Sequence, residues 1–275
     1  MKHPVIFTDL DGTLLDARSY SFERAVPALT LLRQRNIPLV ICSSKTRREI
    51  EHYRELLYND HPFIAENGGG VFIPRYYFTP ETLAISPPPE ESGPYLLLRL
   101  GASYRDLRRA IGELRAGGFA LRGFGDMTAA EVAALTGLTA GEAAMAQERE
   151  FDEPFVAEGP LDEEALNRAV ASKGLSTTKG AFFHLLGKSD KGKAVALLGA
   201  LYARQYGQLF TVALGDSPND LPMLERVDCP VVVRKPDGSY DSRIAVPGLL
   251  RAEGAGPEGW NRAVMSILES LDIRN

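Results

Sequence analysis

Short, continuous runs of apolar residues recur along the chain, and polar or glycine-rich stretches follow them. The runs occupy residues 5–7, 39–42, 63–65, 209–214 and 230–233. Between them lie longer segments with helical periodicity, at 21–35, 47–57, 191–201 and 260–271. Unbroken apolar runs are typical of strands buried on both faces of a parallel sheet. The pattern therefore predicts an α/β core with a doubly wound, mostly parallel sheet, in which strand, polar tip and helix repeat.

The stretch from 74 to 94 interrupts this repeat, because it is rich in proline and turn-forming residues. A second set of elements follows, with strands predicted at 95–100, 119–124, 155–157, 175–178 and 182–186, and helices after Ser103, Thr128 and Thr139 and at 161–173. The first pattern resumes at Lys188. The sequence therefore predicts a smaller α/β domain of residues 87–187, inserted into a core of residues 1–86 and 188–275.

Composition and charge narrow the class of protein. The 275 residues are 44% hydrophobic, which suffices for a well-packed core. A net charge of −5 argues against nucleic acid or an anionic membrane as the partner, and no apolar stretch approaches the ~20 residues of a membrane span. The first apolar run is too short for a signal-peptide core, so we expect a cytoplasmic protein. The oligomeric state is left open.

Two acidic motifs stand where predicted strands end. Asp9 and Asp11 lie in Asp-Leu-Asp-Gly-Thr after the first strand, and Asp216 and Asp220 lie in Gly-Asp-Ser-Pro-Asn-Asp after a later one. The carboxyl ends of parallel strands share the edge at which α/β sheets bind ligands. Carboxylates that close together need a cation, and oxygen ligands without histidine or cysteine suit Mg²⁺. The sequence therefore predicts a magnesium site that faces a phosphate ester.

Other catalytic chemistries find less support. None of the four histidines pairs with a serine or cysteine at a suggestive spacing, and His184 falls in a predicted strand of the inserted domain. Cys42 and Cys229 have no metal-binding spacing and are predicted to be reduced. A serine or cysteine hydrolase is therefore disfavoured.

The two acidic motifs together resemble those of the haloacid dehalogenase superfamily. The resemblance implies that Asp9 is a nucleophile that takes up a phosphoryl group and that Asp11 is the acid/base. It also implies a lysine just ahead of a helix that neutralises the aspartyl-phosphate. Lys191 matches that position, and Lys188 is the alternative.

The same resemblance implies the residues around the metal and the phosphate. The metal site comprises Asp9, Asp11 through its backbone carbonyl, Asp216, and Asp220, which holds water molecules and the lysine. Ser43, or Ser44 one residue later, is expected to donate to a phosphoryl oxygen. The Glu-Asn-Gly sequence after the third strand resembles the substrate loop of sugar phosphatases with a large cap, which makes Asn67 and Gly68 candidate substrate contacts.

The inserted domain resembles the cap of one family within the superfamily. The sequence from 127 to 155, together with Ser-Ser-Lys-Thr at 43–46, is similar to mannosyl-3-phosphoglycerate phosphatases. The resemblance implies Mg²⁺-dependent hydrolysis of mannosyl-3-phosphoglycerate to phosphate and mannosylglycerate, a compatible solute. Arg149 is then a candidate for the substrate carboxylate, Glu150 and Glu153 for sugar hydroxyls, and Lys179 for a further cationic contact.

The substrate alternatives stay open at this point. A phosphatase of the same fold that acts on glucosyl-3-phosphoglycerate or a sucrose-phosphate type of ester would carry the same motifs, and so would a phosphomutase. The core motifs do not distinguish these enzymes, because the leaving group contacts the cap.

Overall fold

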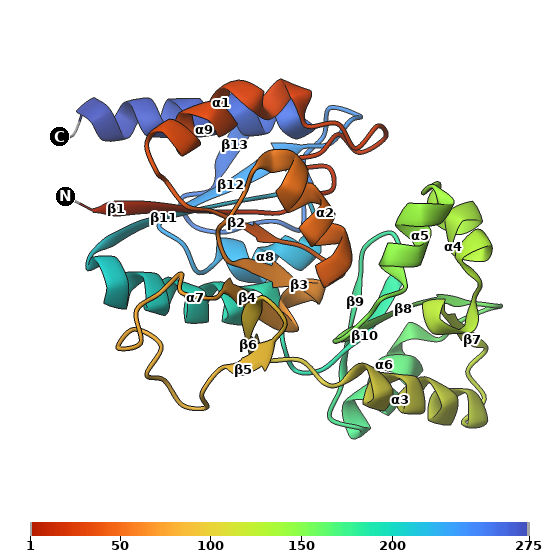
Figure 1. Cartoon of the computed structure of the whole chain (residues 1–275). Helices are drawn as coiled ribbons and strands as arrows, with labels where there is room; N and C mark the ends of the chain where they lie inside the picture. Colours follow the sequence, from red (N-terminus) through yellow and green to blue (C-terminus); the bar gives the residue numbers. More distant parts are fainter. Residues whose placement is uncertain (1, 274–275) are drawn as a thin grey trace.

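The computed structural model describes residues 2–273, which form two α/β units (Figure 1). The larger unit is built on a nine-stranded sheet in the order β13-β12-β11-β1-β2-β3-β4-β6-β5. Neighbours from β13 to β3 are parallel, and β4, β6 and β5 continue the sheet in antiparallel fashion. Its strands are β1 (His3–Thr8), β2 (Leu39–Cys42), β3 (Phe63–Ala65), β4 (Gly70–Pro74), β5 (Glu90–Ser92), β6 (Tyr95–Arg99), β11 (Leu209–Gly215), β12 (Cys229–Arg234) and β13 (Leu250–Ala255). The predicted doubly wound fold is confirmed.

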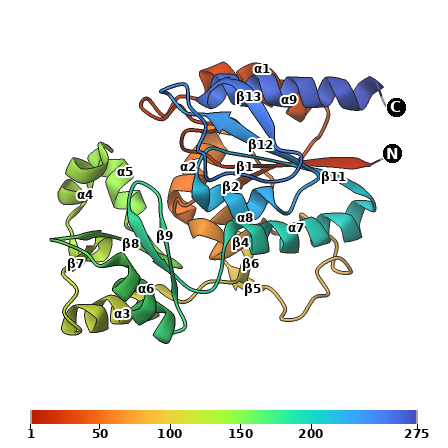
Figure 2. The same cartoon turned by 180° about the vertical axis from the view of Figure 1, so that it is seen from behind.

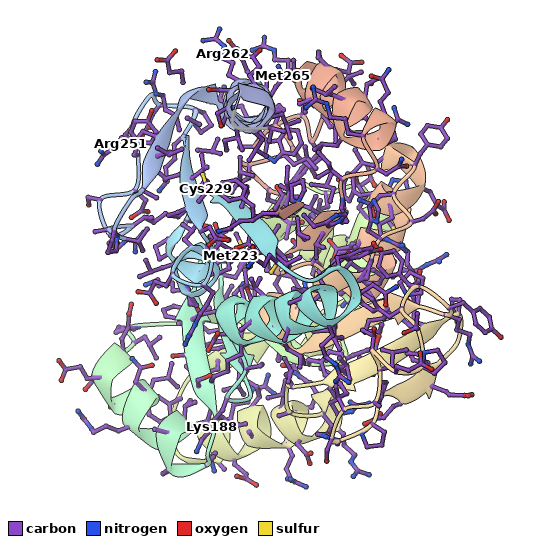
Figure 3. The ribbon with its side chains drawn as sticks, turned by 90° about the vertical axis from the view of Figure 1, so that its left-hand side faces the viewer. Lys188, Met223, Cys229, Arg251, Arg262 and Met265 are labelled. Atoms are coloured by element: carbon purple, nitrogen blue, oxygen red, sulfur yellow. The ribbon has the colours of Figure 1, made fainter. Side chains whose placement is uncertain are left out.

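Helices cover both faces of this sheet (Figures 1 and 2). One face carries α1 (Val26–Gln34), α2 (Arg47–Leu57) and α9 (Gly256–Ile273), and the other carries α7 (Lys191–Tyr206) and α8 (Leu221–Leu224). Side chains alternate across β1, so Ile6 packs in the core that contains Trp260 of α9, and Phe7 in the core that contains Leu198 of α7. Arg262 on the opposite side of α9 projects away from the sheet (Figure 3). Two buried cores on either side of the sheet fix its carboxyl edge.

The smaller unit packs helices against a four-stranded antiparallel sheet in the order β7-β8-β10-β9. Its strands are β7 (Leu121–Gly123), β8 (Asp152–Ala157), β9 (Ser176–Lys179) and β10 (Phe183–Leu186), and its helices are α3 (Tyr104–Ala116), α4 (Ala129–Thr136), α5 (Ala140–Ala146) and α6 (Glu163–Ser172). Capping boxes begin α4 at Thr128 and α5 at Thr139, as predicted. We refer to this unit as the cap.

The expected domain boundary at residue 87 is wrong for the strand that follows it. Residues 95–99, which fall within the predicted inserted domain, form β6 and pair with β4 of the core sheet. The proline-rich stretch before it packs on the core: Tyr77 contacts Tyr202 of α7, and Thr82 donates to Gln205 of α7. We therefore place the crossing into the cap near Gly101 and the return near Gly187, where the two segments lie against each other.

Two further predictions concern membrane spans and the state of the cysteines. None of the helices within residues 2–273 combines the length and apolar character that crossing a bilayer requires. Cys42 is buried in β2 and Cys229 begins β12, and both are free thiols.

Candidate active site

Both acidic motifs meet at the carboxyl edge of the core sheet. β1 and β11 are parallel neighbours in which Thr8 pairs with Leu214, and the Asp9 amide donates to the Leu214 carbonyl at 2.9 Å. Asp216 follows β11, and Asp220 ends the 3₁₀ turn Pro218–Asp220. Carboxylate oxygens of Asp9, Asp216 and Asp220 lie within 4.8 Å of one another. The register of the two strands therefore brings together acids that are about 200 residues apart in sequence.

Lys191 is the lysine that reaches this cluster. It begins α7, and its buried Nζ lies 2.7 Å from Asp9 Oδ1 and 2.6 Å from Asp220 Oδ1. Burial lowers the pKa of Lys191, but the carboxylates of Asp220 and Asp9 outweigh it and hold this pKa above its ordinary value. The alternative, Lys188, is exposed (Figure 3). The structure thus brings Lys191, rather than Lys188, to the predicted nucleophile.

The cluster carries more negative than positive charge. Burial, followed by the charge of Asp220, raises the pKa of Asp9 well above its ordinary range and that of Asp216 to about 7. One lysine faces three carboxylates within the described residues. A hard divalent cation such as Mg²⁺ would offset the excess, and oxygen donors are the ligands that it prefers. The donor set therefore fits a divalent metal.

Asp220 has a different place in the cluster from Asp9 and Asp216. Its Oδ1 accepts from Lys191, and its Oδ2 accepts from the backbone amides of Asp216 and Ser217 at 3.0 and 3.1 Å. Asp220 therefore holds both Lys191 and the loop of Asp216 in place.

Gly12 packs closely against Asp216. Its φ is +74°, and a Cβ at this position would stand 2.8 Å from Asp216 Oδ2, so a larger residue would crowd the Asp216 carboxylate.

Asp11 points away from the carboxylate cluster, toward Lys45, a residue to which the sequence analysis assigned no role. Asp11 Oδ2 lies 3.2 Å from Lys45 Nζ, which also contacts Glu49 at 3.4 Å. Lys45 is buried, and although burial lowers its pKa, Asp11 and Glu49 hold that pKa above the ordinary value. The sequence signal for this role is weak, because a lysine just before a capping box is usually exposed.

A cavity of about 560 Å³ lies between the core edge and the cap. Its core side includes Asp9, Asp11, Asp216 and Ser44. Ser43 does not line it; that residue is fully buried, and its Oγ accepts from the Lys45 amide at 3.2 Å. The structure therefore places the alternative serine, Ser44, at the cavity wall.

Several lining residues were not singled out from sequence. They are Tyr20, Phe124, Leu138, Pro154, Thr178, Phe182, His184, Lys235, Asp241 and Arg243. Lys235 and Arg243 both pair with Asp241 at 2.7 Å. These three side chains together therefore carry one more positive charge than negative charge. Lys179, a predicted substrate contact, also lines the cavity, although its Nζ pairs with Glu163 at 2.6 Å.

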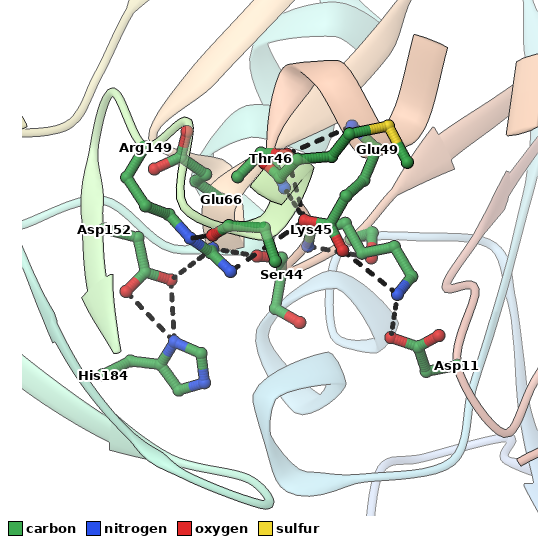
Figure 4. A network of polar contacts seen from close by, with 12 residues as sticks. Asp11, Ser44, Lys45, Thr46, Glu49, Glu66, Arg149, Asp152 and His184 are labelled. Carbon is green, nitrogen blue, oxygen red and sulfur yellow. Dashed lines mark hydrogen bonds and ion pairs between the residues drawn. The ribbon is translucent and has the colours of Figure 1, made fainter. Parts of the chain in front are cut away.

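Arg149 joins the cap to the core. Its side chain is 6% exposed, and it donates to the carbonyls of Ser44 at 2.8 Å and Ala146 at 2.7 Å. Glu49 and Asp152 lie 4.0 and 3.9 Å from its guanidinium (Figure 4). Arg149 lines the cavity as expected for a substrate contact, but most of its donors are already directed at protein oxygens.

The structure does not bring the two predicted glutamates of the cap to the cavity. Glu150 pairs with Arg47 at 3.0 Å, outside the residues that line the cavity. Glu153 is fully buried in the cap and pairs with Arg108 at 2.7 Å. Their chain neighbours Arg149 and Pro154 do line the cavity, and the alternation of side chains along β8 turns Glu153 to the other side of the sheet from Pro154.

The Glu-Asn-Gly loop contacts the cap as well as the core. The buried Glu66 carboxylate accepts from the amides of Glu150 and Phe151, and burial raises the pKa of Glu66 to about 8. Asn67 donates to Asp152 at 3.0 Å. Because its polar atoms are directed at protein partners, the loop serves as the joint against which the cap is seated.

Gly68 packs against the helix that presents Lys191. Its φ is +87°, and a Cβ at this position would stand 2.2 Å from the backbone oxygen of Asp190. We therefore expect Gly68→Ala to lower the free energy of unfolding by about 2–4 kcal/mol and to reduce activity by displacing Lys191. Gly93→Ala is the matched control, since Gly93 also has positive φ (+58°) but no neighbour within 4 Å of the added Cβ. Denaturant titration of both variants measures the difference, and equal losses would contradict this packing role.

Comparisons with known proteins agree with the geometry. Residues 6–83 match the family model of haloacid dehalogenase-like hydrolases. A structure from Thermoplasma acidophilum superposes with a TM-score of 0.68 at 17% identity, covering 98% of this chain and 99% of that one, which supports the fold. The fold is thus that of the haloacid dehalogenase superfamily of hydrolases.

Two relatives define the family within it. A glucosyl-3-phosphoglycerate/mannosyl-3-phosphoglycerate phosphatase of Methanococcoides burtonii is 46% identical over 98% of both chains. The mannosyl-3-phosphoglycerate phosphatase of Pyrococcus furiosus is 38% identical over 82% of this chain and 88% of its own. The chain belongs to the mannosyl-3-phosphoglycerate phosphatase family, as its cap sequence predicted.

Proposed function

We propose that the protein is a Mg²⁺-dependent phosphatase that hydrolyses mannosyl-3-phosphoglycerate to mannosylglycerate and phosphate. The observation that carries the proposal is the contact of buried Lys191 with Asp220 and with Asp9, which lines the cavity between core and cap, in a chain 46% identical to an enzyme named for this substrate. The substrate is a small phosphorylated sugar–glycerate, and its product is a compatible solute.

Asp9 is the nucleophile in this proposal. One of its carboxylate oxygens attacks phosphorus while the bond from phosphorus to the glycerate oxygen breaks, giving an aspartyl-phosphate. Lys191 holds Asp9 in position and offsets the charge of the transferred group. Mg²⁺, bound by Asp9 and Asp216 with the Asp11 carbonyl, would screen the nucleophile from the anionic phosphate.

Asp11 handles the protons. It gives a proton to the departing glycerate oxygen, and then takes one from the water molecule that attacks the aspartyl-phosphate and releases phosphate from Asp9. Lys45 holds the Asp11 side chain beside the cavity, and the Ser44 hydroxyl at the cavity wall is available to a phosphoryl oxygen. The cap encloses the leaving group and limits access of bulk water.

The metal site gives the reaction a pH dependence. The raised pKa of Asp216, about 7, means that below about pH 7 most of the metal-free protein holds a proton there that Mg²⁺ must displace. We expect the Kd for Mg²⁺ to be about tenfold higher at pH 6 than at pH 7.5, with proton release on binding. Isothermal titration calorimetry in two buffers of different ionisation enthalpy measures this, and a Kd that is constant over this range would contradict it.

The same shift changes the stability of metal-free protein. Because the folded-state pKa is above the unfolded value, the folded state binds more protons between about pH 4 and 7. The free energy of unfolding should therefore fall as the pH rises through about 7, and saturating Mg²⁺ should largely abolish the fall.

A panel of phosphate esters tests the proposed substrate. We expect kcat/KM for mannosyl-3-phosphoglycerate to exceed that for sucrose 6-phosphate and hexose 6-phosphates by at least about 100-fold. The glucosyl ester belongs in the panel because the relative from M. burtonii is named for both sugars. Turnover of a hexose bisphosphate without release of phosphate from the glycerate ester would indicate a phosphomutase instead.

A further inference from the structure

His184 lies in the wall of the cavity, on the cap side. It belongs to β10, its side chain is 11% exposed, and its Nδ1 lies 2.8 and 3.0 Å from the two carboxylate oxygens of Asp152 (Figure 4). The opposite edge of the ring, with Nε2, faces the same cavity that Ser44 lines. None of the roles proposed above uses this histidine.

Asp152 fixes which ring nitrogen carries the proton. Its fully buried carboxylate also accepts from Asn67 Nδ2 at 3.0 Å, while Asn67 Oδ1 accepts from Asn219 at 3.1 Å. An ionised carboxylate accepts hydrogen bonds only, so His184 Nδ1 must donate. When the ring carries only this proton, Nε2 is an acceptor directed at the cavity.

The surroundings of Nε2 suit a sugar. Phe124, Leu138, Pro154 and Phe182 provide apolar surface around the cap side of the cavity, and Thr178 adds a hydroxyl. In the part of the chain that the structure describes, neither His184 Nε2 nor Ser44 Oγ has a hydrogen-bond partner. A hexose combines apolar C–H faces with O–H donors, and both are matched here.

We propose that His184 Nε2 accepts a hydrogen bond from a hydroxyl of the sugar in the leaving group, with Asp152 as the residue that positions the ring. The assignment rests on the proposed function, since it supposes a glycosylated phosphoglycerate. The chain Asn219–Asn67–Asp152–His184 then connects the loop of Asp216 to the sugar. It also assigns to His184 the sugar contact that sequence alone had given to Glu150 and Glu153.

His184→Asn tests the proposal. The asparagine amide nitrogen takes the place of Nδ1 and still donates to Asp152, whereas the acceptor at Nε2 is lost. We expect kcat/KM for mannosyl-3-phosphoglycerate to fall by about tenfold or more, mainly through KM. The value for p-nitrophenyl phosphate, which has no sugar, should stay within about twofold of wild type.

His184→Gln is the second variant, because its longer amide reaches the position of Nε2. It should retain more activity on the mannosyl ester than His184→Asn and the same activity on p-nitrophenyl phosphate. Equal effects of His184→Asn on the two esters, or a His184→Gln variant no more active on the mannosyl ester than His184→Asn, would overturn the role of His184. A wild-type enzyme that hydrolyses p-nitrophenyl phosphate but no glycosyl-3-phosphoglycerate would overturn the proposed function and this role with it.

Discussion

Replacing Asp9 by asparagine is expected to abolish phosphate release and to leave the protein folded. The amide is not a nucleophile toward phosphorus, so kcat should fall by at least about 10³-fold. Its oxygen still accepts from Lys191, and the change removes one buried charge from a cluster in which burial and Asp220 disfavour ionisation of Asp9. In the absence of metal, the variant should therefore be at least as stable as wild type.

Asp16→Asn provides the matched control. Asp16 is a half-buried acid of the same N-terminal segment, and its carboxylate accepts from the amides of Arg18 and Ser19 rather than from the cluster. The activity of the Asp16→Asn variant should match that of wild type. If Asp9→Asn kept more than about 1% of wild-type kcat, with its purity verified by mass spectrometry, another residue would have to attack phosphorus.

Replacing Lys191 by methionine should remove both activity and stability. The side chain is fully buried between Asp9 and Asp220, and its loss leaves two buried carboxylates without their cation. Breaking a buried pair from one side costs about 3–5 kcal/mol, so denaturant midpoints should fall accordingly. Lys188→Met is the control, because Lys188 is exposed, and it should change neither activity nor stability appreciably.

A double variant separates the two roles of Lys191. Adding Asp220→Asn to Lys191→Met removes one of the stranded charges and should recover part of the lost stability. Activity should stay lost, because the lysine that offsets the charge of the transferred phosphoryl group is still missing. Recovery of activity together with stability would mean that Lys191 is a structural residue only.

Much of the core was predictable because its signals are local. An unbroken apolar run such as 39–42 indicates a buried strand, and Thr46 followed by Glu49 indicates where a helix begins; both elements have the predicted bounds. Asp9 and Asp216 could be placed at one edge because the carboxyl ends of parallel strands must share it. The order of the strands in the sequence and the geometry of a parallel sheet were sufficient to predict this placement of the two acids.

The rest depends on partners that are distant in the sequence. The burial of Lys45 follows from its pairing with Asp11, and a single charged residue gives no sign of that. Strand β6 pairs in the core sheet because the proline-rich stretch before it folds back onto α7. His184 was set aside as a strand residue, and its orientation into the cavity became visible only with Asp152 beside it.

The proposed mechanism requires transfer of a phosphoryl group from mannosyl-3-phosphoglycerate to Asp9. Rapid chemical quenching of stoichiometric enzyme, substrate and Mg²⁺, followed by mass spectrometry of the peptides, measures that transfer directly. We predict a transient phosphoryl group on Asp9, formed in wild type and absent from Asp9→Asn. Release of phosphate without any phosphorylated enzyme, or a phosphoryl group on another residue, would contradict the account.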